Sequence, residues 1–395
     1  MLEKIKKNRN LIGILGSGIM NDVFQLFLNT FMVAYFITLT NYNYKIISIY
    51  YILVYLFLSI TFFLMGRIVK NISQIYIYRL GIILKAIYIL FLAILKDKIV
   101  DYYIYLGIFY GIVQGLYWVA AHSLINEHAS KKYDSYISIK AIFDKILKIL
   151  FPIIFGVSIQ LTSFAYIAKI VLILSVIQII FSLLIVDKTV VSEKKYDFKK
   201  FYLKYKNNKL IKQTGKLTAY GGVVNNLLDT LITIMIILTF KTTVSLGFLT
   251  TLFSVCSIIS VYVFNKKIKN KNLALSISTL GLILSVLLIA FNVTKLTIII
   301  YNLSAGLFLV LLKNTADAKR YAIADQIEET KQDYLVEYHV LVEAYLNISR
   351  VISYAILLII SFFNNAATFN ILLILMVVFI YFYYKNIVSI NKNVK

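Results

Sequence analysis

Cysteine, proline and tryptophan occur only once each in this chain, and histidine occurs three times. The single cysteine, Cys256, has no second cysteine to pair with, which excludes a disulfide within the chain and a cysteine metal cluster. The sequence also has no paired aspartates of the kind that bind a metal diphosphate, and no Gly-rich phosphate loop. We therefore expect no metal, no other cofactor, no ATP-driven pumping and no enzymatic activity.

Charge is scarce as well. Only 15% of the residues are charged and 60% are hydrophobic, whereas soluble domains carry roughly 25% charged residues. The chain therefore lacks the polar residues to cover a water-soluble globule, and we expect the lipid bilayer to be its main solvent. The net charge of +23 would suit a nucleic acid, but the basic residues lie in short runs between apolar segments and not on one face. We predict an integral membrane protein with no nucleic-acid partner.

Long apolar segments recur along the whole chain. A helix that spans a bilayer needs about 20 predominantly apolar residues. On that criterion the sequence predicts an all-α fold with about twelve transmembrane helices. The expected ranges are 11–39, 45–65, 74–95, 101–121, 135–160 and 164–186, followed by 217–240, 244–264, 273–291, 296–312, 334–362 and 367–384.

A basic stretch at residues 187–216 divides the apolar segments into two groups. It is rich in lysine, and aromatic residues between 196 and 205 interleave with the lysines. This pattern gives part of the stretch an amphipathic character, so it either lies along a membrane surface or is a solvated connector. We therefore expect an N-terminal bundle at 1–186, a basic cytosolic linker at 187–216 and a C-terminal bundle at 217–395.

The distribution of lysine and arginine predicts the orientation. If the N-terminus is cytoplasmic, the inner loops and the linker hold most of the basic residues outside the helices, and the outer loops hold only Lys45, Lys96, Lys98, Lys241 and Lys295. Cytoplasmic loops carry an excess of basic residues. We therefore expect a multi-pass protein of the plasma membrane with both termini in the cytoplasm.

The two halves carry corresponding polar residues. The matching positions are Gly18, Asn21 and Asp22 with Gly222, Asn225 and Asn226, and Asp144 with Glu343. Two six-helix halves joined by a long linker are typical of transporters built from repeats. This organisation resembles the major facilitator superfamily (MFS) over essentially the whole chain. The resemblance implies a bacterial transporter, of a subgroup with unassigned substrate, whose two bundles rock about a central site.

Short family motifs are present in altered form. In the loop after the second helix, Gly66 fits the family pattern, but Lys70 stands where an acid is usual and Ser73 replaces a second glycine. The gating role of that acid therefore cannot be transferred to this chain. In the fifth helix, Pro152 and Gly156 match part of the antiporter motif of the family. By resemblance, this partial match favours export.

Ionisable and polar side chains inside the apolar segments are the candidates for a site. A charge in the bilayer core costs several kcal/mol unless it is paired or faces water. Polar residues recur every three to four positions in helices one, five, seven and eleven, which places them on one face of each helix. The candidates for substrate binding or proton coupling are Asp22, Gln25, Asp144, Lys148, Asp229, Glu343, Asn347 and Arg350.

Polar stripes at similar depth in four helices predict a hydrated cavity near the middle of the bilayer. Other residues are candidates for lining this cavity. They are Asn21, Gln114, Tyr117, Trp118, Asn225, Asn226 and His339. These residues also have a structural interpretation. The asparagines could form hydrogen bonds between helices, and the aromatic residues could be ordinary packing. His339 and Lys140 could be solvated near the cytosol. We expect Asp144 with Lys148, and Glu343 with Arg350, to form proton-coupling pairs, unless they are fixed structural ion pairs.

These features together predict a secondary active transporter that works as a monomer on a small-molecule substrate. We expect proton-coupled efflux of an amphipathic or toxic compound, with protons as the coupling ion. The alternatives are a nutrient importer, such as one for sugars, or a lipid flippase on the same fold. A membrane-embedded enzyme that modifies lipids is a further alternative, which metal- or ATP-dependent turnover would favour.

Overall fold

The computed structural model describes residues 9–41, 43–69, 72–129, 133–186, 196–268, 270–326, 334–363 and 366–391, and its regular secondary structure within these ranges is helical. In the first half, α2 (Arg9–Leu26), a π-helix (Phe27–Met32) and α3 (Val33–Leu39) form one continuous segment. It is followed by α4 (Tyr44–Val69), α5 (Gln74–Leu95), a 3₁₀ turn (Lys96–Val100), α6 (Tyr103–Ala129), α7 (Tyr133–Leu161) and α8 (Phe164–Leu183).

The second half begins after a short helix in the linker, α9 (Phe198–Tyr205). The long helices that follow are α10 (Lys209–Phe240), α11 (Thr243–Lys266), α12 (Lys271–Phe291), α13 (Lys295–Gln326), α15 (Leu335–Ser361) and α16 (Ala366–Asn391). Three of them are longer than the sequence predicts, and one is α16, which runs to Asn391 instead of residue 384. The seventh spanning helix starts at Lys209 instead of residue 217, where the Asn208 side chain caps it by accepting from the Leu210 and Ile211 amides. The tenth continues from residue 312 to Gln326.

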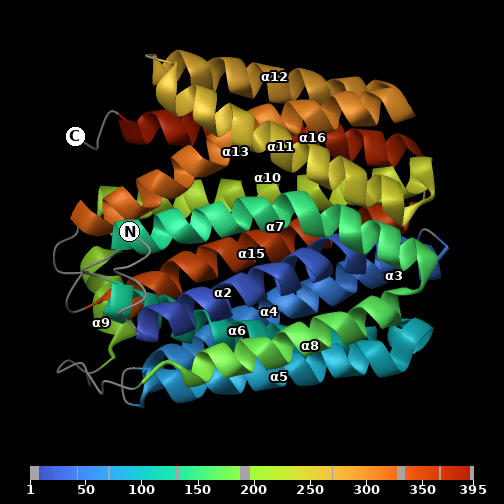
Figure 1. The fold of residues 1–395 in the computed structure, drawn as a ribbon. Coiled ribbons are helices and arrows are strands. Elements are labelled where there is room, and N and C mark those ends of the chain that lie inside the picture. The colour runs from blue at the N-terminus through green and yellow to red at the C-terminus, as the bar shows by residue number, and fades with distance from the viewer. Residues whose placement is uncertain are drawn as a thin grey trace.

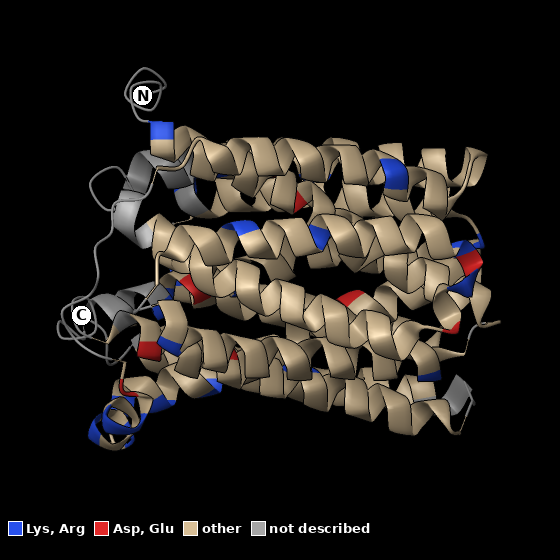
Figure 2. Ribbon diagram, turned by 90° about the horizontal axis from the view of Figure 1, so that it is seen from below, with Lys and Arg blue, Asp and Glu red and all other residues tan. Residues whose placement is uncertain are grey.

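Eleven helical segments in the described part of the chain are long and apolar enough to cross a membrane. The twelfth segment of the expected set is α7, which is 29 residues long and runs beside the others (Figure 1). Its apolar composition is interrupted by Lys140, Asp144, Lys145 and Lys148 in the first half of the helix. Figure 2 shows few other charged residues along the middle of the bundle.

Helix packing repeats between the two halves. The contacts of α2 with α7 and α8, of α4 with α6, and of α5 with α6 and α8 have counterparts in those of α10 with α15 and α16, of α11 with α13, and of α12 with α13 and α16. The expected arrangement of two pseudo-repeated bundles is therefore confirmed. The halves meet mainly through two helix pairs, α4 with α15 and α7 with α11. The first helix starts and α16 ends at the end of the bundle that carries α9 (Figure 1).

The contact between α7 and α11 is a backbone contact. A Cβ on Gly247 would lie 2.2 Å from the carbonyl oxygen of Pro152, and one on Gly156 would lie 2.5 Å from that of Thr243. Only glycine permits this approach. The side chain of Thr243 also donates to the Gly156 carbonyl at 2.8 Å. The two halves are thus joined tightly at the end of the bundle that lies far from α9.

Candidate functional site

A cavity of about 170 Å³ lies between the two halves. Its walls come from the π-helix, α10, α11 and α13, so both halves contribute. The lining side chains with polar groups are Asn29, Thr30, Asp229, Thr233, Thr250, Tyr301 and Asn302, and apolar residues such as Ile232, Phe253 and Leu309 complete it. Polar groups of both halves thus meet in this cavity.

Asp229 is the carboxylate of this cavity. Its side chain is exposed although helices of both halves surround it, so it is exposed to the cavity. The cations that act on its charge are Lys313, on α13, and Lys148, on α7. A carboxylate can accept hydrogen bonds from a donor and can exchange a proton. The structure places this sequence-predicted residue on the wall of the cavity.

Asn302 supplies the complementary group. Its side chain is only 4% exposed and lines the cavity, and its amide nitrogen donates to no described residue. A buried donor without an acceptor costs roughly 1–3 kcal/mol. A bound molecule with an acceptor group would remove this cost. Asn302 and its neighbour Tyr301 were missed from the sequence, because a neutral amide and a phenol in an apolar helix carry no distinctive pattern.

The π-helix at Phe27–Met32 places Asn29 and Thr30 in the cavity wall. A π-helical turn inserts an extra residue into the α-helical ladder and is frequent at functional sites. It changes the rotation of the following side chains about the helix axis. For this reason Asn29 lies in the cavity, whereas Gln25 and Asn21, one and two turns earlier, make contacts inside the first half.

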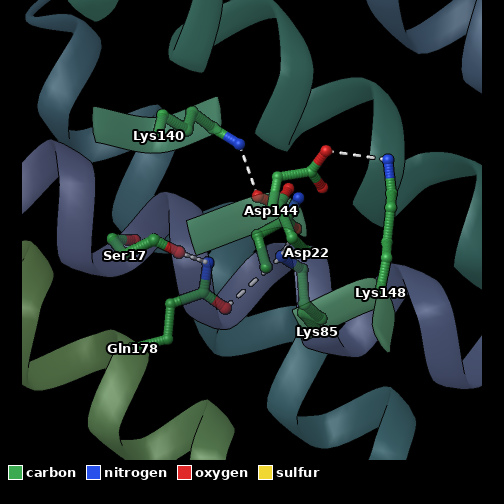
Figure 3. Close-up of polar contacts among 8 residues, drawn as sticks. Ser17, Asp22, Lys85, Lys140, Asp144, Lys148 and Gln178 are labelled. Atoms are coloured by element: carbon green, nitrogen blue, oxygen red, sulfur yellow. Dashed lines mark hydrogen bonds and ion pairs between the residues drawn. The ribbon is translucent and has the colours of Figure 1, made fainter. Parts of the chain in front are cut away.

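A charged cluster on α2 and α7 occupies the first half (Figure 3). Asp22 on α2 forms an ion pair with Lys140 on α7. One turn further along α7, Asp144 pairs with Lys148 at 2.8 Å. The sequence-predicted pair of Asp144 with Lys148 is thus formed, and Lys140, expected to be solvated, instead pairs with Asp22. Both pairs are partly exposed.

Lys85 on α5 extends this cluster into the core of the first half (Figure 3). Its side chain is 0% exposed. The ammonium group donates to the side-chain oxygen of Asn21 and, at 3.4 Å, to the side-chain oxygen of Gln178 on α8. It lies 3.8 Å from the ring centre of Tyr117. Gln178 in turn donates to the Ser17 carbonyl at 3.0 Å. The sequence interpretation missed Lys85, although a lone lysine in the middle of the third apolar segment is itself a signal.

Gln25 and Gln114 face each other between α2 and α6. The Gln114 side-chain oxygen accepts from Gln25 and from the Trp118 indole, both at 2.9 Å. Tyr110 donates to the Gln25 oxygen at 3.3 Å. These candidates therefore come together, but in a network inside the first half. Tyr117, buried beside Lys85, belongs to the same packed region.

Candidates on α15 form a chain of contacts. Asn347 donates to Glu343 at 3.3 Å, and Arg350 donates to Asn347 at 3.1 Å. The expected direct pair of Glu343 with Arg350 is therefore replaced by a contact through Asn347. The Arg350 guanidinium lies 4.9 Å from the ring centre of Tyr55 on α4.

Two further candidates, Asn226 and His339, contact residues of the other half. The Tyr55 hydroxyl donates to Asn226 on α10 at 3.3 Å. His339 on α15 stacks on His122 of α6, with ring centres 5.3 Å apart and planes at 6°. Asn225 is half-buried on α10. The stacked imidazoles thus form a contact between the halves rather than a cavity wall.

Most of the sequence matches a known family. The sequence model of the Major Facilitator Superfamily covers residues 7–320. The chain belongs to this superfamily. It is 23% identical over 380 residues to the uncharacterized protein YqgE of Bacillus subtilis (strain 168), covering 91% of this chain and 86% of that protein.

Solved transporters share the fold. The nucleoside transporter NupG superposes with a TM-score of 0.67 at 13% identity, covering 98% of this chain and 99% of that one. A bacterial homologue of the iron transporter ferroportin, in an inward-facing state, gives a TM-score of 0.68 at 12% identity with the same coverage. Family membership makes this MFS chain a multi-pass membrane transporter of small molecules and not an enzyme.

Proposed function

We propose that this MFS protein exports a small polar or amphipathic molecule in exchange for protons, and that substrate and proton meet at Asp229. The observation that carries the proposal is the position of this carboxylate in a cavity to which both halves contribute. Rocking of the halves changes such a cavity directly, as alternating access requires. A carboxylate that binds either a proton or a substrate donor would couple the two fluxes.

The lining groups favour a particular class of substrate. Asp229 accepts hydrogen bonds, the free amide of Asn302 donates, and Tyr301 does both. The volume of about 170 Å³ is below the roughly 300–1,000 Å³ of sites for drug-sized ligands. These features support a small organic molecule with donor and acceptor groups over a whole lipid.

The packing of α7 bears on the state and direction. Its contacts with α11 at Gly156 and Gln160 lie far from the linker, whereas residues 141–150 are exposed or half-exposed. With the linker in the cytoplasm, this arrangement would give the substrate access from the inside. Binding from the cytoplasm supports export, together with the Pro152–Gly156 motif in the same helix.

The first test is the accumulation of labelled compounds in cells that express the protein, with and without a protonophore. The panel contains nucleosides and iron, because the descriptions of NupG and of the ferroportin homologue mention them. It also contains sugars and cationic dyes. Proton-driven export predicts that accumulation of one compound falls on expression and recovers with the protonophore. Increased accumulation would instead establish import.

The variant Asp229→Asn tests the coupling residue. It keeps the shape of the side chain and removes its charge and its titration, so we expect proton-driven export to fall at least about ten-fold, the equivalent of about 1.4 kcal/mol. Asp101→Asn, at an exposed position after the 3₁₀ turn, is the matched control and should transport normally. Normal, equally pH-dependent export by Asp229→Asn would remove Asp229 from the mechanism.

A further inference from the structure

The linker helix α9 is amphipathic and docked. Phe201 on its inner face is 0% exposed, and its ring lies 5.7 Å from that of Tyr334 at the start of α15. Phe198 contacts Phe63 of α4 edge to face, with ring centres 5.4 Å apart. Asp197 caps the helix by accepting from the Lys200 amide. The aromatic face therefore fixes α9 across the ends of one helix from each half.

The outer face of α9 combines cations with apolar surface. Lys199, Lys200 and Lys204 are exposed there. Between them, Tyr202 and Leu203 are 46% and 52% exposed. Exposed apolar side chains among lysines, at the end of transmembrane helices, match the boundary between headgroups and acyl chains of a bilayer.

A second cavity of about 170 Å³ lies between α9, the start of α10 and α15. Two lysines line it, Lys206 just after α9 and Lys212 on α10. The remaining walls are aromatic and apolar: Tyr202, Tyr205, Ile211, Leu341 and Tyr345. The cavity is thus a pocket lined by two lysines, phenol groups and apolar side chains, outside the proposed transport site.

We propose that this pocket binds the phosphate headgroup of an anionic membrane lipid. The ammonium groups of Lys206 and Lys212 would contact the phosphate oxygens, and ammonium groups bind phosphate as point charges. The exposed Tyr202 and Leu203 beside the pocket would contact the acyl chains of the same lipid. A lipid fits better than a soluble phosphate because only a lipid uses the cations and the adjoining apolar surface together.

Such a lipid would connect the linker to the second half. Lys206 belongs to the linker and Lys212 to the first turn of α10, the helix that carries Asp229. A phosphate held by both would fix the angle at which the linker enters α10. The binding measurement below does not depend on transport, so it stands or falls separately from the proposed export.

The experiment compares nanodiscs of phosphatidylglycerol with nanodiscs of phosphatidylcholine, using the purified full-length protein and native mass spectrometry to count retained lipids. We expect preferential retention of phosphatidylglycerol. The double variant Lys206→Gln/Lys212→Gln should weaken its binding at least about ten-fold, because it removes both charge-assisted contacts to the phosphate oxygens. The variant Lys206→Arg/Lys212→Arg keeps both positive charges and should retain binding. Retained binding would show that substitution at these positions leaves the pocket folded.

The matched control is Lys199→Gln/Lys200→Gln, which removes the same charge from the exposed face of α9 but not from the pocket. It should bind phosphatidylglycerol nearly as well as the unmodified chain. Equal losses in both double variants would mean unspecific attraction to a charged surface, and equal retention of the two lipids would also overturn the proposal. Displacement of the lipid by millimolar inorganic phosphate would identify a soluble anion as the ligand instead.

Discussion

At the scale of single residues, Lys85 is the least expected feature of the chain. A fully buried ammonium is costly unless polar partners solvate it, and here the side-chain oxygens of Asn21 and Gln178 do so. Lys85→Met should therefore destabilise the protein by about 1–3 kcal/mol, because it leaves those oxygens unpaired. Thermal unfolding of the purified protein measures this effect.

A double variant distinguishes unpaired oxygens from a general packing defect. Adding Asn21→Leu to Lys85→Met removes one of the unpaired groups and should recover part of the lost stability, since replacing both partners by apolar groups is nearly neutral. The loss of stability in the double variant can be compared with the sum of the losses in the two single variants. If the double variant loses more than that sum, the packing of Lys85 matters rather than its hydrogen bonds.

The residue scale also shows which features a sequence pattern can identify. Charges in apolar segments are conspicuous, so Asp22, Asp144 and Asp229 were all predicted from their cost in lipid. Their partners were harder to predict, because pairing depends on the rotation of each helix about its axis. Asp22 pairs with Lys140 across two helices, and no spacing within one helix indicates that contact.

At the scale of elements, the glycine contact between α7 and α11 controls how closely the halves approach. A Cβ at position 247 would meet the Pro152 backbone, which cannot move aside as a side chain can. We expect Gly247→Ala to destabilise the protein by about 1–3 kcal/mol through overpacking. The midpoint of thermal unfolding is the measurement.

Gly281→Ala on α12 is the matched control. A Cβ there would meet the ring of Phe308, a side chain that can rotate, within the second half. It should therefore cost less than Gly247→Ala. A larger loss of stability at position 281 would show that the backbone contact at Gly247 tolerates a Cβ better than the side-chain contact at Gly281 does.

The hydropathy pattern could not predict where α10 begins or where the π-helix lies, and each has an identifiable reason. The charges between Lys209 and Lys216 resemble linker, but the Asn208 cap starts the helix there. The π-helix at Phe27–Met32 has an apolar sequence like its neighbours, so only the backbone shows it. Since this turn places Asn29 in the cavity, the missed backbone detail is part of the missed site.

At the scale of the whole molecule, the architecture follows from hydropathy and repetition. Apolar segments of spanning length and a basic divider predict two bundles, and the paired helix contacts confirm them. The cavity was predicted only as a depth at which polar stripes meet. Its actual walls require the relative position of the halves, which depends on contacts such as Gly247 with Pro152.

The orientation in the membrane is the remaining prediction at this scale, and the single cysteine makes it testable. In a Cys256→Ser background, we expect Asp101→Cys, in the exposed turn before α6, to react with a membrane-impermeant thiol reagent in intact cells. Leu203→Cys on the exposed face of α9 should react only after permeabilisation, because the excess of lysine keeps the linker inside. The Cys256→Ser parent, which has no thiol, gives the background signal. The opposite labelling pattern would place the linker and both termini outside, and the cavity opening inferred from α7 would then face the exterior and favour import.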